Sequence, residues 1–165
     1  MENRKKPIAI LYLEDNEDDV ELLRLTLNKS NLNYNLACVS TKDEFLKLHL
    51  QDYDVIITDY NLADYDGLSA IKYIRSFDVA IPIILLSGTV GEELAADLLR
   101  AGANDFVLKS NMKKIVIAVE RGIRETSIVR EKKRFQKELL EKNLILDTIF
   151  DRFEDLIFLK DAAGR

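Results

Sequence analysis

Acidic, hydroxyl and amine side chains stand at the ends of four short apolar runs of this chain. In chain order they are Glu14 and Asp15, then Asp59, Ser87 and Lys109. Carboxylates held close together repel one another, and one of them becomes protonated unless a cation lies between them. A hard divalent cation removes that conflict. No His or Cys stands near these acids to favour zinc, so we expect the cation to be Mg²⁺.

A magnesium ion, an ammonium group and a hydroxyl together suit phosphoryl transfer, in which positioning and charge neutralisation do most of the catalysis. One carboxylate would be the nucleophile and would form an acyl phosphate. Asp59 is the strongest candidate, because its run lies centrally, between the acidic pair and Lys109. Lys109 would neutralise phosphoryl oxygens, and Ser87 would donate a hydrogen bond to one of them.

Five apolar runs have the length and β-branched content of strands, and amphipathic segments with helical spacing separate them. The runs cover residues 8–13, 34–39, 54–59, 82–87 and 105–108. Their continuous apolar character indicates strands covered on both faces, as in a parallel sheet between two helical layers. We therefore predict a doubly wound α/β domain. Ligands of such sheets bind beyond the carboxyl ends of the strands, where the acids, Ser87 and Lys109 stand.

These motifs, in this order and spacing, resemble the receiver domain of two-component response regulators over about residues 7–125. The resemblance is carried by the acidic pair, by D-Y-N-L-A-D-Y-D-G from Asp59 to Gly67, by L-S-G-T-V-G around Ser87, and by F-V-L-K ending at Lys109. It implies a flavodoxin-like fold, with five parallel strands in the order 2-1-3-4-5 and a long C-terminal helix after them.

The resemblance also assigns roles. It implies that Asp59 is phosphorylated by a partner histidine kinase or phosphotransfer protein, and that Phe106 is a rotating switch aromatic. Ser87 and Lys109 would bind the phosphoryl group. The implied Mg²⁺ ligands are Glu14, Asp15, Asp59 and the backbone carbonyl of Asn61. The domain would not be an enzyme, beyond accepting its own phosphoryl group from a donor and losing it slowly.

Two other functions remain open from the sequence. One is a pseudo-receiver that is never phosphorylated and serves as a dimerisation or protein interaction module. Retention of Asp59 and Lys109 argues against it. The other is a Mg²⁺-dependent phosphohydrolase of small substrates, although the chain lacks a cap segment that would hold one.

Three further acids follow the acidic pair, namely Glu17, Asp18 and Asp19. We expect them to form a solvated helix start, where acidic side chains complement the helix dipole.

After residue 125 the composition changes to one rich in Lys, Glu, Leu and Arg, without Gly or Pro up to residue 163. Residues 126–150 are predicted to form a helical linker with a possible coiled-coil seam. The seam residues are Ile128, Phe135, Leu139, Lys142, Leu146 and Ile149. We interpret the seam as the contact of a parallel homodimer, which forms through this helix, through the face of the fourth helix and fifth strand, or through both. The alternative is a helix that packs on its own domain.

Residues 151–165 resemble the truncated start of a PAS sensor domain, with a strand at DLIFLKD.

Composition limits the remaining classes. The 165 residues include 29 acidic and 24 basic side chains, for a net charge of −5, so we expect no direct nucleic-acid binding. The chain has one Cys, and no apolar run approaches the roughly 20 residues of a membrane span. We therefore expect a cytoplasmic protein without membrane insertion.

Overall fold

The computed structural model describes residues 6–77, 80–88 and 92–162. The chain divides into two compact units, residues 1–126 and residues 127–165. The expected site and strands lie in the first unit, and most of the long last helix lies in the second.

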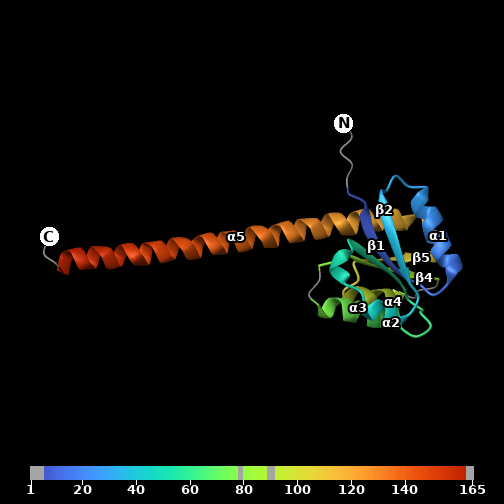
Figure 1. Cartoon of the computed structure of the whole chain (residues 1–165). Coiled ribbons are helices and arrows are strands. Elements are labelled where there is room, and N and C mark those ends of the chain that lie inside the picture. Colours follow the sequence, from blue (N-terminus) through green and yellow to red (C-terminus); the bar gives the residue numbers. More distant parts are fainter. Residues whose placement is uncertain (1–5, 78–79, 89–91, 163–165) are drawn as a thin grey trace. The chain divides into compact units, whose positions relative to one another are not determined.

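The first unit is built on a five-stranded parallel sheet, as predicted (Figure 1). In chain order the strands are β1 (Ile8–Leu13), β2 (Tyr34–Val39), β3 (Val55–Asp59), β4 (Ile83–Ser87) and β5 (Asp105–Leu108). Their order in the sheet is β2-β1-β3-β4-β5, which confirms the expected topology. All five residues of β3 and of β4 are buried, as continuous apolar runs require.

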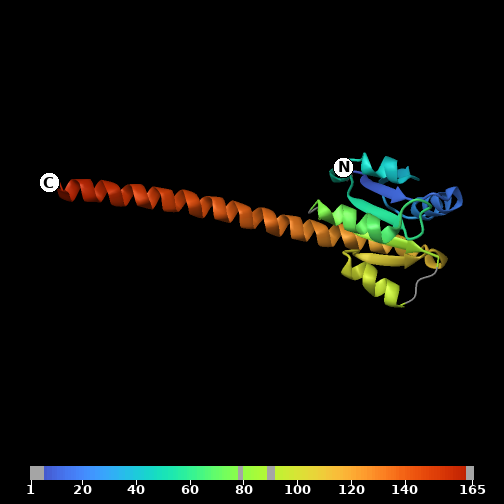
Figure 2. The ribbon, with the colours of Figure 1, turned by 90° about the horizontal axis from the view of Figure 1, so that it is seen from below.

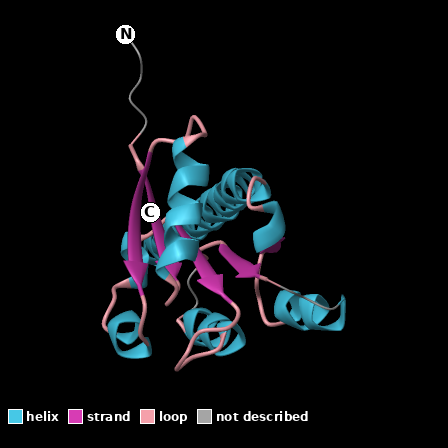
Figure 3. Cartoon of the chain, turned by 90° about the vertical axis from the view of Figure 1, so that its right-hand side faces the viewer, coloured by secondary structure: helices cyan, strands magenta, loops and turns pink. Residues whose placement is uncertain are grey.

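Helices cover both faces of this sheet (Figure 2, Figure 3). The helices are α1 (Glu17–Asn28), α2 (Lys42–Leu46), α3 (Gly67–Ser76), α4 (Glu92–Arg100) and α5 (Lys114–Ala162), with short 3-10 turns η1 (Leu50–Asp52) and η2 (Lys109–Asn111). Alternate residues of each strand enter two different cores. One core joins the sheet to α1 and the first turns of α5, and the other joins it to α2, α3 and α4.

Two side-chain caps begin helices close to the carboxyl ends of the strands. Asn16 caps α1 by accepting a hydrogen bond from the backbone N–H of Asp18. Asp66 caps α3 in the same way, through the backbone N–H of Ser69. Gly67 then begins α3 so close to the end of β3 that a Cβ there would lie 2.8 Å from the carbonyl oxygen of Asp59. Only glycine permits that approach.

Helix α5 differs from the prediction at its far end. It continues to Ala162, through residues 155–161, where we expected a strand. An apolar run of this length can belong to a helix or to a strand, and the helix formers before it continue the α-helical pattern. In the first unit, Gly122 of α5 lies against Pro82, where a Cβ would be 2.7 Å from the proline Cβ. Among the described residues, no helix is long and apolar enough to cross a bilayer.

Candidate functional site

The ammonium group of Lys109 is the centre of the site at the carboxyl ends of β1, β3 and β5. Its Nζ lies 2.8 Å from Glu14 Oε2, 2.7 Å from Asp19 Oδ2 and 3.0 Å from Asp59 Oδ1. The Lys109 side chain is 16% exposed, so these ion pairs are shielded from water. The three carboxylates carry more negative charge than one ammonium neutralises.

Glu14 is held more firmly than a surface acid, because both of its carboxylate oxygens accept hydrogen bonds. Oε2 accepts a hydrogen bond from the Tyr12 hydroxyl at 2.7 Å in addition to the Lys109 contact, and Oε1 accepts one from the backbone N–H of Asn16. Tyr12 is fully buried in the core under α1 and α5. Sequence reasoning treated Tyr12 as part of an apolar strand and missed this role, although a buried Tyr two residues before a strand-end acid is the signal that could have revealed it.

Burial and hydrogen bonding compete in setting the pKa values here. Burial raises the pKa of Glu14 above its ordinary value, although hydrogen bonds from Lys109, Tyr12 and Asn16 oppose the shift. Burial also raises the pKa of Tyr12, and its hydrogen bond to Glu14 adds to that effect. For Lys109, burial lowers the pKa, but the hydrogen bonds to Asp19, Glu14 and Asp59 outweigh burial and raise the pKa. Lys109 therefore stays protonated.

Asp59 ends β3 with its two oxygens in different contacts. Oδ1 faces Lys109, and Oδ2 accepts a hydrogen bond from the backbone N–H of Asn61 at 3.0 Å. Only 6% of the Asp59 side chain is exposed. Asp15 is exposed, and its Oδ2 accepts a hydrogen bond from the backbone N–H of Ala63, in the loop that follows Asp59. Asp15 thus joins the end of β1 to the loop after Asp59.

Asp19 is the acid that the sequence interpretation misplaced. Glu17 and Asp18 are exposed in the first turn of α1, as expected, but Asp19 points to Lys109 and only 23% of its side chain is exposed. The three acids are adjacent in sequence. The cap at Asn16 sets the helical phase, and that phase turns the third acid toward the sheet.

Comparison with known proteins decides the family. The family model described as "Response regulator receiver domain" matches residues 10–120, about two thirds of the chain. The chain belongs to the response regulator receiver domain family. Receiver domains of this family are signalling proteins rather than typical enzymes, and they interact with histidine kinases or phosphotransfer proteins.

Individual relatives agree with the family. The cell cycle response regulator CtrA of Brucella ovis is 32% identical over 112 residues, which cover 67% of this chain and 47% of that protein. The transcriptional regulatory protein ZraR of Salmonella typhimurium is 29% identical over 102 residues, which cover 62% of this chain and 23% of that protein. The match thus spans between about a quarter and a half of these relatives. A solved signal receiver domain from Vibrio parahaemolyticus has the same fold, with a TM-score of 0.67 and 21% identity over 76% of this chain and 96% of that one.

Ser87 and Phe106, which the sequence also singled out, lie on β4 and β5. Ser87 is fully buried at the end of β4, the strand that pairs with β3 and β5 on its two sides. Phe106 of β5 is half-buried and packs against the core under α2, α3 and α4. The two residues therefore lie on neighbouring strands.

Receiver domains generally use Mg²⁺ for phosphorylation, and the donor atoms of this site fit that ion. The acids and the Asn61 carbonyl supply oxygen alone, which is the ligand type that Mg²⁺ prefers. In the part of the chain that the structure describes, no three His, Cys, Asp or Glu side chains are gathered around a metal position. Glu14, Asp19 and Asp59 converge on Lys109 instead.

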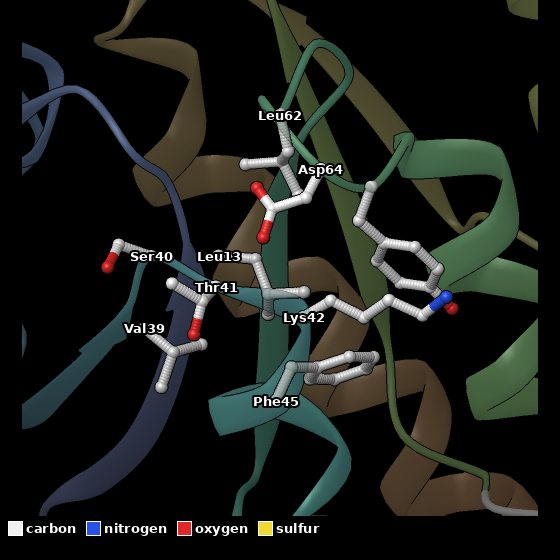
Figure 4. A pocket seen from close by; sticks show the side chains of 9 residues that line it. Leu13, Val39, Ser40, Thr41, Lys42, Phe45, Leu62 and Asp64 are labelled. Carbon is white, nitrogen blue, oxygen red and sulfur yellow. The ribbon is translucent and has the colours of Figure 1, made fainter.

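Two hollows lie among the described residues of the first unit. Figure 4 shows a hollow beside the loop that follows Asp59, and its lining includes Ser40, Thr41 and Lys42 together with Leu62 and Asp64. Its volume of about 10 Å³ holds roughly one water molecule. A larger groove of about 410 Å³ lies between residues 48–52 and the end of α3, at Tyr73 and Phe77. That groove is at the amino ends of the strands, away from Asp59.

Proposed function

We propose that Asp59 accepts a phosphoryl group from a phosphohistidine of a partner histidine kinase or phosphotransfer protein. One oxygen of the Asp59 carboxylate attacks phosphorus, an O–P bond forms, and the P–N bond to the partner's imidazole breaks. The imidazole leaves with the bonding pair and takes up a proton. The observation that supports this proposal best is the 3.0 Å ion pair between Asp59 and Lys109 at the edge of the sheet where ligands bind.

The neighbouring residues take complementary roles in this proposal. Lys109 offers its charge to the phosphoryl oxygens, and Ser87 donates a hydrogen bond to one of them. Asp15, Asp59 and the Asn61 carbonyl would hold Mg²⁺, which when bound neutralises charge on the transferring group. Glu14 also belongs to the proposed ligand set. Its Oε2 already accepts two hydrogen bonds and its Oε1 accepts one, so Oε1 is the oxygen that would bind the metal.

Phosphorylation would then change the conformation of the domain. Ser87 moves toward the phosphoryl group and Phe106 turns inward, and the size of the population shift is set by how much more tightly the phosphoryl group binds the second conformation. The signal passes through α5 to an output module. We place this reaction in the cytoplasm. Apart from accepting its own phosphoryl group and losing it slowly, the domain catalyses no reaction.

Two alternatives give different results in one experiment. The chain is incubated with Mg²⁺ and acetyl phosphate and then weighed by mass spectrometry, beside Asp59→Asn and the control Asp64→Asn, which changes an exposed acid of the same loop. We expect a gain of one phosphoryl group in the wild type and in Asp64→Asn, and none in Asp59→Asn. No gain in any protein would favour the non-phosphorylated interaction module. Turnover of a phosphate ester without an adduct would favour the phosphohydrolase.

We also propose that the chain forms a parallel homodimer through α5. Five apolar residues of the expected seam are exposed on α5 between residues 128 and 149, namely Ile128, Phe135, Leu139, Leu146 and Ile149. A helix gains stability when such a stripe is covered by a second copy. The face of α4 and β5, where Leu99 and Leu108 are exposed, is a second candidate contact.

Sedimentation tests the α5 dimer with a matched pair of variants. Leu139→Lys puts a charge in the seam, whereas Leu144→Lys makes the same change at an exposed leucine on the opposite side of the helix. We expect Leu139→Lys to sediment as a monomer and Leu144→Lys to remain dimeric. A wild type that is monomeric at all concentrations, or equal behaviour of the two variants, would contradict the seam.

We further propose that residues 151–165 lead into a PAS sensor domain. The support is the sequence resemblance alone, since the backbone is helical up to Ala162. NMR chemical shifts of residues 155–161 in a longer chain test it, because extended shifts would favour a PAS strand and helical shifts would oppose it.

A further inference from the structure

Lys109 has no hydrogen-bond donor to spare in the unphosphorylated chain. An ammonium group carries three N–H donors, and three carboxylate oxygens lie within 3.0 Å of Nζ. A phosphoryl oxygen that binds Lys109 must therefore replace one of these carboxylates.

The three carboxylates differ in how readily they can leave. Glu14 is 1% exposed on its side chain, and Tyr12 and the backbone N–H of Asn16 also hold it. Asp59 would carry the phosphoryl group on one oxygen and keep the other oxygen beside Lys109. Asp19 is 23% exposed and stands in the first turn of α1. Its released carboxylate would regain water and would still be stabilised by the helix dipole.

Electrostatic repulsion also favours release of Asp19 from Lys109. A phosphoryl group on Asp59 brings new negative charge next to Lys109, and Asp19 is an anion on the same ammonium group. Asp19 and the phosphoryl group would therefore repel each other as well as compete for the same donor.

We propose that Asp19 is a positioning residue that holds Lys109 in the unphosphorylated chain and releases it when a phosphoryl group is bound at Asp59. Asp19 is thereby an internal competitor that lowers the affinity of the site for the phosphoryl group. This inference rests on the proposed function of Asp59.

The test uses fluoroberyllate, whose beryllium bonds to a carboxylate oxygen and whose three fluorides take the places of phosphoryl oxygens. Its affinity for the full chain is measured by fluorine NMR at saturating Mg²⁺, with the Mg²⁺ affinity of each variant determined separately. The variants are Asp19→Asn, Asp19→Glu and the control Asp18→Asn, which removes the same charge from an exposed acid one residue away.

We expect Asp19→Asn to bind fluoroberyllate about fivefold to tenfold more tightly than the wild type, the size expected when a charge-assisted hydrogen bond becomes a neutral one. Asp18→Asn and Asp19→Glu should stay within about twofold, which is the scale of weakly coupled surface charges. The rate constant of phosphorylation by acetyl phosphate should rise in Asp19→Asn by a similar factor.

Three other results would contradict the proposed competition or the proposed function. Equal effects of Asp19→Asn and Asp18→Asn would show general electrostatics and no competition. Weaker fluoroberyllate binding by Asp19→Asn would show that Asp19 supports Lys109 in the bound state. If the wild type takes up neither fluoroberyllate nor a phosphoryl group at Asp59, the proposed function fails and this inference fails with it.

Discussion

Removing the hydroxyl of Tyr12 tests the hydrogen bond that holds the buried carboxylate of Glu14 in the site. Tyr12→Phe keeps the ring in the core and deletes a hydrogen bond of 2.7 Å to the Glu14 carboxylate. A hydrogen bond to a charged group contributes about 1.5–3 kcal/mol. Glu14 keeps its contacts to Lys109 and to the N–H of Asn16, so its charge is not left unpaired. We therefore expect the free energy of unfolding at pH 7 to fall by about 2 kcal/mol.

A matched variant separates this loss from the general effect of a missing hydroxyl. Tyr34 donates a hydrogen bond of 2.6 Å to the side chain of Asn28, but this pair is neutral and exposed. Tyr34→Phe should therefore cost less than about 1 kcal/mol. Urea unfolding followed by tyrosine fluorescence measures both variants. All six tyrosines precede residue 74 and the chain has no tryptophan, so the signal reports on the first unit alone.

The cost of Tyr12→Phe should also depend on pH. Burial raises the pKa of Glu14, so the native state takes up a proton before the unfolded chain does as the pH falls. The penalty for burying the Glu14 charge is present at neutral pH and is relieved on acidification toward the ordinary pKa of a glutamate. Because the Tyr12 hydroxyl favours the charged form, the difference between Tyr12→Phe and the wild type should shrink over that same range. A loss no larger than that of Tyr34→Phe, or one that is constant with pH, would refute this reasoning.

Two further substitutions test a close helix–sheet contact of the first unit and the cap of α3. Gly122→Ala places a Cβ 2.7 Å from the Cβ of Pro82, and we expect urea unfolding to show a loss of about 1–3 kcal/mol from overpacking. Gly88→Ala is the control because, among the described residues beyond its chain neighbours, no atom lies within 4 Å of the Cβ position, and equal losses would contradict the packing argument. Asp66→Ala removes the α3 cap and should cost about 1 kcal/mol at pH 7. Hydrogen bonds from Ser69 lower the pKa of Asp66, so its stabilisation is present above the ordinary aspartate pKa and is lost as the pH falls through the lowered value. A cost of Asp66→Ala that persists unchanged in acid would count against a charged cap.

Most of the sheet could be predicted from the sequence because its strands are short apolar runs, and the central strands β3 and β4 are buried on both faces. Continuous apolar runs leave little choice between strand and loop, and the predicted run at residues 54–59 begins only one residue before Val55–Asp59. The meeting of Lys109 with Glu14 and Asp59 could also be predicted, since the carboxyl ends of parallel strands share one edge.

Features that depend on side-chain direction could not be predicted in this way. Asp19 reaches Lys109 because of the phase of α1, and that phase depends on where the helix begins. Tyr12 reaches Glu14 only because a glutamate is long enough to turn back toward its own strand. The strand predicted at residues 155–161 was wrong for a different reason, because the apolar pattern there permits a helix as well as a strand.

The charges at this site explain why Lys109 is paired with the site's own carboxylates in the unphosphorylated form. Glu14, Asp19 and Asp59 bring three negative charges to one ammonium group, which leaves two in excess if all of them are ionised. A phosphoryl group adds more negative charge at the same place, so the site can accept it only by gaining a cation or by losing an anion. Mg²⁺ supplies the cation in our proposal, and release of Asp19 into water removes the anion. Because both changes lower the same electrostatic cost, neutralising Asp19 should let the chain accept a phosphoryl group at a lower Mg²⁺ concentration once the metal affinity of each protein is taken into account.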